Sequence, residues 1–391
     1  MISVNQARQF IRDHSPTPVI TESATGTALG KVLAAPVYAP FDLPHFRQSA
    51  MDGYAIRHGR ENYVVKGESK AGDNCTLKLA EGEACRIFTG AMVPENADTV
   101  VIQEHTTVSG QNLILHKIPR AGANIRAIGE QIRKGSPVLQ KGTKLNSAGI
   151  GMLAGFGIEK VEVFAVPRIG IIATGSELLS PSDKPEPGKI YDSNTLMLKT
   201  ALIENGCPGV NIYRAKDEKT HTEHIIKQAL QENDILLISG GISVGEYDFV
   251  QGALRANRVK EIFYKVNHKP GKPLWFGKKD RKTVFALPGN PASVLTCFYI
   301  YVLPELRRQR GITEPENKWY RARTKSKILN PKEKTMFLRA YIENGIAEIP
   351  DGQSSAMLHG FITANAIAMI PENTSVLHEN QSIEYMLMEY N

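Results

Sequence analysis

The chain has 391 residues, more than one hydrophobic core usually serves, so its length predicts two or three domains. Hydrophobic residues make up 42% and charged residues 22%, close to soluble globular averages, which excludes an intrinsically disordered chain. Lysine plus arginine exceed aspartate plus glutamate by 47 to 40, a net charge of +7. That excess is compatible with nucleic acid, an anionic membrane or a phosphate-bearing small molecule, and on its own it indicates a solubilising surface.

Cysteine usage and the N-terminal sequence predict a cytoplasmic protein. The four cysteines lie far apart without a Cys-x-x-Cys pair, which indicates reduced core thiols (Cys75, Cys85, Cys207 and Cys297). The N-terminal sequence has no signal-peptide pattern, and no apolar run approaches the roughly 18 residues that span a bilayer. We therefore expect neither a membrane association nor a disulfide framework.

The N-terminal part reads as one helix followed by β-structure. Apolar residues recur at helical spacing over residues 3–14, and Pro16 ends that helix. From about residue 20 to 165, short β-branched segments alternate with glycine-rich turns, which predicts an all-β region of one or two modules. The glycines over residues 149–155 miss the spacing of a dinucleotide-binding motif, and we expect a turn there.

Residues 166–312 predict a doubly wound α/β domain with a parallel sheet. Apolar strand patterns such as DILLISGG alternate with amphipathic helices of 10–15 residues, and a long helix ends the region. The segment KKDRK over residues 278–282 reads as the charged tip of a hairpin. Residues 314–316 form an expected linker, and alternation over residues 317–391 predicts a small β-domain.

Ligands of open α/β sheets bind beyond the carboxyl ends of the strands, and six consecutive strand ends here carry glycines with an acid, a lysine or a hydroxyl. Such glycines let backbone N–H groups approach an anion, and interspersed carboxylates suggest Mg²⁺ between protein and phosphate. The candidate residues are Gly175, Glu177, Asp192, Ser193, Asp217, Gly240, Gly241, Ser243, Gly245, Asp248, Lys269, Lys272, Pro288, Gly289, Asn290, Pro291 and Ser293.

Lysines add positive charge to this predicted site. Lys265 and Lys269 are four residues apart on a predicted strand and therefore on one face, and Lys272 follows just past a turn. Three converging lysines would hold phosphate or another oxyanion. Any single glycine-rich turn is ordinary architecture, and Ser193 is best explained as a helix cap. The six turns together favour a phosphate-plus-metal site.

Two other functions, a serine hydrolase and a nucleic-acid-binding protein, can be compared with the residues. Gly241-Ile242-Ser243-Val244-Gly245 fits the nucleophile elbow of a serine hydrolase. That function also needs an aspartate and then a histidine later in the chain, and the only later histidines are His268, His359 and His378. No Walker A motif occurs, and basic residues are not interleaved with aromatics, so no nucleic acid partner is expected. Asp52 and Thr89, in the β region, read as turn and strand-end residues.

Taken in order, the strings SAMDGYA, RIFTGAMVP, GANIRAIGEQI, TGSEL, YDSN, GGISVGEYD, KPGKP and LPGNPAS resemble the molybdopterin molybdenumtransferase family, which includes the E domain of gephyrin. The resemblance covers essentially the whole chain. It implies insertion of molybdate into adenylylated molybdopterin, with Mg²⁺-dependent release of AMP. It also implies a homodimer in which the N-terminal β domain of one subunit completes the site of the other.

The resemblance assigns roles to individual residues. Asp52, Thr89, Glu177, Asp217 and Asp248 match active-site positions, and charge makes Asp248, Glu177 and Asp217 the candidate Mg²⁺ ligands. Lys265, Lys269 and Lys272 would neutralise the pyrophosphate or hold molybdate, and Ser293 matches the serine of the LPGNPxS motif. Arg339 and Ser355 match the arginine and serine of the molybdate pocket, where a guanidinium fork suits a tetrahedral oxyanion.

The resemblance also implies a division into five parts. These are an N-terminal helix over 1–19, a linking β domain over 20–45 and 136–165, and a β domain over 46–135 that completes the partner's site. An α/β molybdopterin-binding domain over 166–312 and a C-terminal β-barrel over 317–391 follow. Expected partners are an upstream molybdopterin adenylyltransferase and downstream molybdenum-enzyme apoproteins or chaperones.

One departure and two further alternatives remain. Gln131 stands where the family usually has aspartate, which removes a charge from that position. A related protein could adenylylate the pterin, but that half-reaction resembles proteins with Thr-Gly after the paired glycines, where this chain has Ile242-Ser243. A molybdopterin-binding scaffold without catalysis is the other alternative.

Overall fold

A computed structural model describes residues 1–242, 249–331 and 334–388. The chain divides into two compact units. The α/β–barrel unit comprises Met1–Ser23, Ala28–Ala34 and Glu162–Asn391, and the N-terminal β unit comprises Ala24–Thr27 and Ala35–Val161. The strands β1 (Ile20–Ala24) and β12 (Lys160–Phe164) lie where the chain passes from one unit to the other. No helix in the described ranges is long and apolar enough to cross a bilayer.

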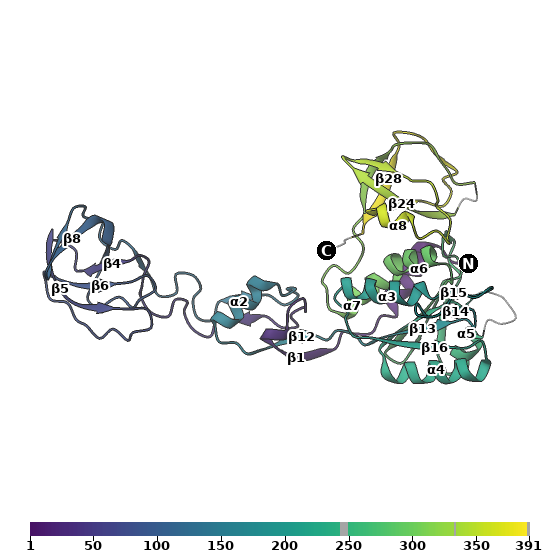
Figure 1. The fold of residues 1–391 in the computed structure, drawn as a ribbon, viewed down its shortest axis with the longest axis horizontal. Helices are drawn as coiled ribbons and strands as arrows, with labels where there is room; N and C mark the ends of the chain where they lie inside the picture. Colours follow the sequence, from purple (N-terminus) through teal and green to yellow (C-terminus); the bar gives the residue numbers. More distant parts are fainter. Residues whose placement is uncertain (243–248, 332–333, 389–391) are drawn as a thin grey trace. The chain divides into compact units, whose positions relative to one another are not determined.

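A six-stranded sheet, in the order β16-β13-β17-β21-β20-β18, forms the centre of the α/β–barrel unit (Figure 1). Its first four strands are parallel, as the alternation of strands and helices predicts. Strand β20 alone runs in the opposite direction, antiparallel to both β21 and β18, because the short turn at Asp280-Arg281 returns the chain directly into β21. The strands are β13 (Ile169–Thr174), β16 (Val210–Ala215), β17 (Ile235–Ser239), β18 (Lys260–Tyr264), β20 (Trp275–Lys279) and β21 (Lys282–Leu287).

Helices cover both faces of this sheet (Figure 1). The helices α3 (Ser193–Glu204), α6 (Pro291–Cys297) and α7 (Leu303–Gln309) lie on one face, and α4 (Lys219–Glu232) and α5 (Val250–Ala256) lie on the other. Successive residues of β13 therefore enter different cores: Ile171 packs with the first set of helices, and Ile172 packs with the second. Burial on both faces explains the continuous apolar runs of the central strands.

Local sequence rules account for the helix ends. Ser3 and Gln6 form a capping box at the start of α1 (Val4–Asp13). Asp192, rather than Ser193, caps α3 by accepting a hydrogen bond from the Thr195 amide at 3.1 Å. A left-handed Gly206, with φ +74°, follows the end of the same helix. The predicted long final helix consists of α6, a π-helical stretch over Phe298–Val302, and α7.

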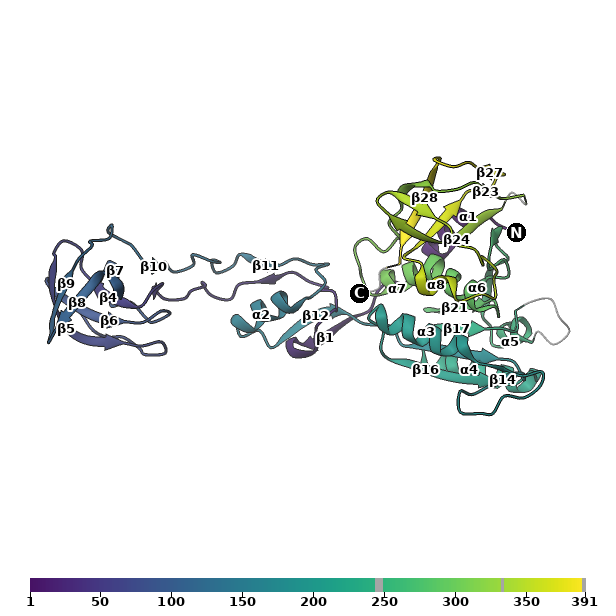
Figure 2. The ribbon, with the colours of Figure 1, turned by 45° about the horizontal axis from the view of Figure 1, so that its top comes forward.

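The C-terminal segment forms a closed five-stranded barrel, β24-β25-β22-β28-β26, with β24 also paired to β26. The barrel strands are β22 (Tyr320–Thr324), β24 (Thr335–Glu343), β25 (Ile346–Glu348), β26 (Ala366–Ile370) and β28 (Ser382–Leu387). Strands β23 (Ile328–Leu329) and β27 (Val376–Leu377) pair separately, and β19 (His268–Lys269) joins β24 from the α/β domain. Figure 2 shows α8 (Gly360–Thr363) on the side of the barrel that faces α6 and α7.

The N-terminal β unit is built on a six-stranded sheet in the order β7-β4-β6-β5-β9-β8. Its strands are β4 (Gly53–Ile56), β5 (Asn62–Ser69), β6 (Glu83–Ile87), β7 (Thr99–Ile102), β8 (Thr106–Ser109) and β9 (Asn112–Leu115). Two short pairs accompany it: β2 (Val37–Tyr38) with β11 (Pro137–Leu139), and β3 (Gln48–Ser49) with β10 (Ile125–Arg126). The turn expected over residues 149–155 is wrong, because Ser147–Gly155 forms helix α2, capped by the Asn146 side chain.

Candidate functional site

The carboxyl ends of all four parallel strands surround one cavity of about 300 Å³. Thr174 ends β13 and is followed by Gly175 and Glu177; Asp217 follows β16, and Gly240, Gly241 and Ile242 follow β17. The remaining lining residues come from the turns after β19 and β21 and include Pro273, Pro288 and Gly289. Five of the six strand ends singled out in the sequence therefore meet at one place.

Two carboxylates face this cavity. Asp217 is held in place because its Oδ2 accepts a hydrogen bond from the Ser176 amide at 2.8 Å, which leaves Oδ1 available. The Glu177 carboxylate folds over Gly175, where a β-carbon would come within 2.5 Å of Glu177 Oε2. Gly175 also has a φ of +137°, so both space and backbone conformation require glycine there.

The glycine pair lets backbone line the floor of the cavity. Gly240 and Gly241 have φ values of +89° and +61°, and a β-carbon at Gly241 would lie 2.8 Å from Thr174 Oγ1. Thr174 in turn donates a hydrogen bond to the Ser239 carbonyl at 3.2 Å. The pair is therefore held against β13, and its backbone can approach a ligand closely.

Asn194 braces the site from helix α3 and was absent from the predicted site residues. Its Nδ2 donates hydrogen bonds to Gly289 O at 2.7 Å and to Ser239 Oγ at 3.0 Å, so it joins the turns after β17 and β21. Its Oδ1 is buried and has no partner among the described residues. The only hint in the sequence was its place in the YDSN string. Of the predicted neighbours, Asp192 serves as the cap and Ser193 is exposed.

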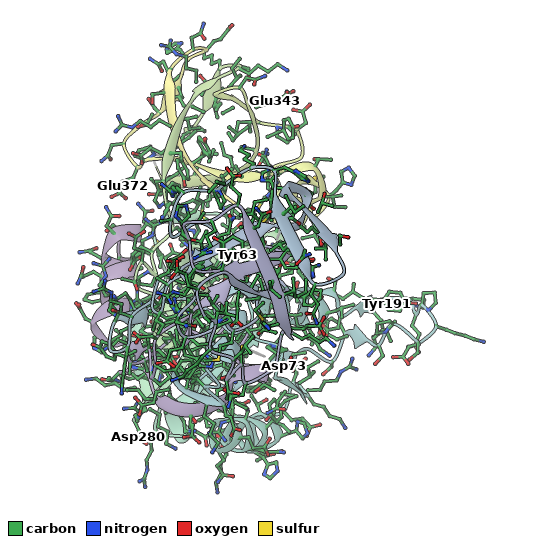
Figure 3. All side chains as sticks on the ribbon, turned by 90° about the vertical axis from the view of Figure 1, so that its left-hand side faces the viewer. Tyr63, Asp73, Tyr191, Asp280, Glu343 and Glu372 are labelled. Atoms are coloured by element: carbon green, nitrogen blue, oxygen red, sulfur yellow. The ribbon has the colours of Figure 1, made fainter. Side chains whose placement is uncertain are left out.

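Tyr191, the first residue of the YDSN segment, lies on a short two-stranded arm. The strands β14 (Leu178–Leu179) and β15 (Ile190–Tyr191) pair in parallel, and Figure 3 shows Tyr191 on this protruding arm. Lys189, on the same arm, donates a hydrogen bond to Ser176 O at 2.6 Å. The arm is therefore tied to the loop that positions Asp217 and Glu177.

The three predicted lysines do not share one strand face. Strand β18 ends at Tyr264, and Lys265 has a φ of +66°, so the two-residue period does not extend to Lys269 in β19. The turn closes by hydrogen bonds from Lys265 N to Leu274 O at 2.9 Å and from Val266 N to Lys272 O at 3.1 Å. Lys269 and Lys272 are exposed, whereas Lys265 Nζ lies 4.6 Å from the Tyr264 ring centroid.

The C-terminal barrel reaches the turn after β21 through Ser355. Ser355 Oγ accepts a hydrogen bond from Asn290 Nδ2 at 2.9 Å, and Ser355 O accepts one from Ala292 N at 3.1 Å. Arg339, in β24, donates to the Gly352 and Ser354 carbonyls, just before Ser355. The structure thus brings Arg339, Ser355 and Asn290 into one row that continues to Gly289 at the cavity.

Arg339 is a buried cation without an acidic partner among the described residues. Its side chain is 1% exposed, and its Nε and Nη1 make no hydrogen bond there. Burial lowers the pKa of its guanidinium, and Phe361 covers one face with its ring 5.5 Å away. The absence of a side chain at Gly360 leaves room beside Arg339 Nε, because a β-carbon on Gly360 would lie only 3.0 Å from that atom. A buried, unpaired guanidinium suits an anionic ligand.

The other residues predicted from the sequence lie outside the lining of the cavity or outside the described ranges. Pro291 opens α6, and Ser293 is buried in its first turn with 2% exposure, away from the lining of the cavity. Gln131 has an exposed side chain, and its backbone N–H donates a hydrogen bond to Leu43 O at 3.0 Å. Ser243, Gly245 and Asp248 lie outside the described residues.

Asp52 and Thr89 form a separate cluster in the N-terminal β unit. Asp52 Oδ1 accepts hydrogen bonds from both the amide and the hydroxyl of Thr89, each at 2.7 Å. These two bonds, with the nearby charge of Arg86, hold the pKa of Asp52 below its ordinary value. Arg86 itself is fixed by bonds to Gly53 O and Gln103 Oε1. The structure therefore presents an ionised carboxylate with a hydroxyl beside it.

The donor set of the cavity fits a magnesium ion. Glu177 and Asp217 offer oxygen ligands, and Mg²⁺ is usually held by one or two carboxylates together with waters and substrate phosphates. Within the described ranges, no group of three or more histidine, cysteine or acidic side chains could hold a metal. Asp248, the first-choice ligand from the sequence, belongs to the undescribed segment.

The positions of the three later histidines do not support a serine hydrolase. His268 is buried, and its ring lies 5.6 Å from Tyr301 and 5.7 Å from Phe337. Burial lowers the pKa of His268 to about 3, and both ring nitrogens lack a described partner. His359 precedes α8, and His378 lies in the turn before β28. No described acid orients His268 as a general base.

Three family models match consecutive parts of the chain. The MoeA N-terminal region (domains I and II) matches residues 2–157. A probable molybdopterin binding domain matches residues 170–308, and the MoeA C-terminal region (domain IV) matches residues 321–388.

Curated relatives and a solved structure agree with these matches. The molybdopterin molybdenumtransferase of Haemophilus influenzae is 34% identical over 318 residues, covering 80% of this chain and 78% of the relative. That of Staphylococcus epidermidis is 32% identical and covers 100% and 96%. The crystal structure of the molybdopterin biosynthesis moea protein from Pyrococcus horikosii superposes with a TM-score of 0.83 at 30% identity, covering 100% and 99%.

Proposed function

The chain is an enzyme of the molybdopterin molybdenumtransferase (MoeA) family, and we propose that it inserts molybdate into adenylylated molybdopterin with Mg²⁺-dependent release of AMP. The observation that supports this most is the meeting of four parallel strand ends, two carboxylates and a glycine pair at one cavity. A row of groups from Gly289 to Arg339 connects that cavity to a buried cation.

The proposed reaction begins with hydrolysis of a phosphoric anhydride. Water attacks the adenylyl phosphorus, the bond to the bridging oxygen breaks, and AMP separates from the pterin phosphate. The two dithiolene sulfurs then bind molybdenum, and one oxygen atom of molybdate leaves as water with the two thiol protons. Asp217 and Glu177 would hold the Mg²⁺, which neutralises phosphate charge when it is bound.

The chain's own residues bind and orient the substrate. The backbone of Gly240 and Gly241 can approach the phosphates closely, because no side chain separates them from the cavity. Asn194 fixes the facing turns, so that the two sides of the cavity keep their separation. Lys269 and Lys272 are exposed and can neutralise the anhydride, and Lys265, Pro288 and Pro291 are proposed as further contacts, whereas Ser293 is buried in α6.

Arg339 and Ser355 are proposed to bind molybdate. Arg339 has two unpaired donor atoms in a buried environment, where an oxyanion is held strongly. Ser355 Oγ already accepts from Asn290, so its hydroxyl hydrogen is free to donate. Both residues are connected to the turn that lines the cavity, so molybdate bound to them would lie beside the pterin phosphate.

A direct assay tests the proposed reaction. Purified protein is incubated with adenylylated molybdopterin, Mg²⁺ and molybdate, and AMP and active cofactor are measured. We expect both products from the parent, and strongly reduced AMP release from Glu177→Gln and Asp217→Asn. Glu204→Gln, at the exposed end of α3, is the matched control. Absence of AMP release from the parent protein contradicts the proposal.

We further propose a homodimer in which Asp52 and Thr89 complete the partner subunit's site. The cluster is an exposed, ionised carboxylate that lies far along the chain from the other acids and has no catalytic partner in its own unit. Inactive Asp52→Ala and Asp217→Ala subunits, when mixed, should recover part of the activity, because each heterodimer keeps one intact site. Recovery of no activity despite heterodimer formation argues against shared sites.

The cellular setting is proposed on the same basis. A cytoplasmic enzyme of molybdenum cofactor biosynthesis would receive its substrate from a molybdopterin adenylyltransferase and deliver cofactor to apoproteins or chaperones. Co-purification with an adenylyltransferase that carries bound adenylylated molybdopterin would measure the first exchange directly.

A further inference from the structure

A second cavity, of about 440 Å³, lies on the α4–α5 face of the α/β domain and is lined by four cations. Lys227 comes from α4, Arg258 follows the end of α5, and Lys279 and Lys282 flank the hairpin turn between β20 and β21. Its other lining residues are uncharged: Leu230, Gln231, Ala256 and Asn257. We call these eight residues the basic cavity.

The basic cavity is separate from the candidate functional site. Lys282 is the first residue of β21 and Leu287 is the last, so the two cavities lie at opposite ends of this strand. At about 3.3 Å per residue, the strand alone separates them by more than 15 Å. Figure 3 labels Asp280 at the turn of the hairpin, beside Lys279. A ligand here would leave the strand-end cavity open.

Two features of the basic cavity are unfavourable for the fold itself. Lys279 and Lys282 lie directly opposite each other in the antiparallel hairpin, and two like charges in such a pair destabilise the hairpin. Arg258 has a φ of +59° at a helix end where glycine or asparagine is the usual residue. The side chains of Lys227, Arg258 and Lys279 form no hydrogen bond or ion pair with the described part of the chain.

Helix termini explain at most two of the four, because Arg258 also follows the C-terminal end of α5, where a positive charge is favoured. Lys282 Nζ donates to Asn233 O at 2.8 Å, which satisfies a carbonyl at the end of α4. Lys227 lies within α4 rather than at its end, and Lys279 belongs to a strand. A structural role for their charges would need a carbonyl or carboxylate partner. Three unpaired cations around an uncharged concave surface instead favour an anion with several charges.

We propose that the basic cavity binds a small ligand with two or more phosphate groups. The volume falls in the range of small-molecule sites, and the amides of Gln231 and Asn257 with an apolar floor at Leu230 and Ala256 leave room for an attached organic group. Inorganic pyrophosphate and a nucleoside triphosphate share the required chemistry, and the experiment distinguishes them.

The test uses the full-length protein with Lys269→Ala and Lys272→Ala, so that phosphate binding at the strand-end cavity is weakened. Inorganic pyrophosphate, ATP and an octaglutamate peptide are titrated separately by calorimetry without Mg²⁺. We expect one equivalent of pyrophosphate or ATP to bind. Tighter binding of ATP identifies a nucleotide as the source, and equal affinity identifies the phosphates alone.

A pair of double variants locates the site. Arg258→Gly/Lys279→Gln removes two lining cations, and glycine suits the φ of residue 258. Arg255→Gln/Lys260→Gln removes two exposed cations of the same region that do not line the cavity. Each charge-assisted contact contributes about 1.5–3 kcal/mol, so we expect the first variant to lose at least about tenfold in affinity and the second to change little.

Three outcomes overturn the proposal: no phosphate binding in the Lys269→Ala/Lys272→Ala protein, equal losses in both double variants, or binding of octaglutamate alone. The last would mean an acidic protein segment in place of a phosphate ligand. None of these results depends on molybdenum transfer, so failure here and failure of the proposed function are distinguishable.

Discussion

Asn194 holds Gly289 by a hydrogen bond of 2.7 Å from its side-chain amide to the glycine carbonyl, and the same amide nitrogen reaches Ser239. One side chain thus connects the start of helix α3 to the turns that follow β17 and β21. We predict that Asn194→Ala lowers kcat/KM by about 10-fold to 100-fold, because small displacements of a binding turn are costly for a reaction that needs exact alignment.

The matched control is Asn205→Ala at the other end of α3, whose side chain donates to Ala201 O and does not line the cavity. Each lost hydrogen bond costs about 1 kcal/mol in stability, so both variants should have slightly lower melting temperatures. Only Asn194→Ala should lose activity. Equal kcat/KM values in the two variants would exclude a positioning role for Asn194.

The Asp52–Thr89 pair predicts a titration effect. Thr89→Val removes the hydroxyl donor and keeps the amide, so the pKa of Asp52 should rise toward, but not reach, its ordinary value of 3.8. Carboxyl NMR of aspartate-labelled protein measures the change. Thr107→Val, whose hydroxyl contacts His116 instead, should leave the Asp52 titration unchanged.

The lowered pKa of Asp52 also makes the free energy of unfolding depend on pH. The folded-state pKa of Asp52 lies below its unfolded value, so its contribution is fully present above pH 3.8 and is lost as the pH falls through the lower folded-state pKa. Thr89→Val should therefore reduce the acid sensitivity that comes from this carboxylate. An unchanged Asp52 titration in Thr89→Val would contradict the assigned contacts.

The α/β domain could be predicted well from the sequence, for reasons visible in single strands. Strand β13 sends Ile171 and Ile172 into two different cores, which produces an uninterrupted apolar run ending at Gly175. Parallel strands then place their following turns at one edge, so the cavity position followed from chain order. The hairpin at Asp280 was also predicted, although its consequence, the reversed direction of β20 within the sheet, was not.

Other features depend on non-local contacts that no short pattern contains. The lysine argument was wrong because the chain leaves the strand conformation at Lys265, where a positive φ is uncommon for a residue with a side chain. Helix α2 contains Gly149, Gly151 and Gly155, and forms despite their low helix propensity. The role of Asn194 arises from turns about 45 and 95 residues away, which one sequence cannot bring together.

The glycine pair predicts a steric effect. Gly241→Ala should destabilise the fold by about 1–3 kcal/mol, because φ is +61° and the new β-carbon would lie 2.7 Å from Val250 Cγ2. Gly252→Ala, in helix α5 with open space around it, should be neutral or stabilising by up to about 1 kcal/mol. Thermal unfolding measures both, and similar melting temperatures would show that Gly241 is not constrained as described.

Arg339 predicts a separation of molybdate binding from folding. Arg339→Met keeps a long side chain in a site of 1% exposure and removes a buried charge that has no described acidic partner. Replacing such a charge by an apolar group is often neutral for stability, here offset by the lost bonds to Gly352 and Ser354. The melting temperature should therefore change little.

Molybdate affinity should instead fall at least about tenfold in Arg339→Met, because charge-assisted bonds to an oxyanion contribute about 1.5–3 kcal/mol each. Calorimetric titration with molybdate measures this, and sulfate tests whether the site prefers the larger anion. Arg323→Met, exposed on β22 of the same barrel, should bind molybdate as the parent does. Since both variants lose one positive charge, parent-like affinity in Arg339→Met would remove this guanidinium from the proposed pocket.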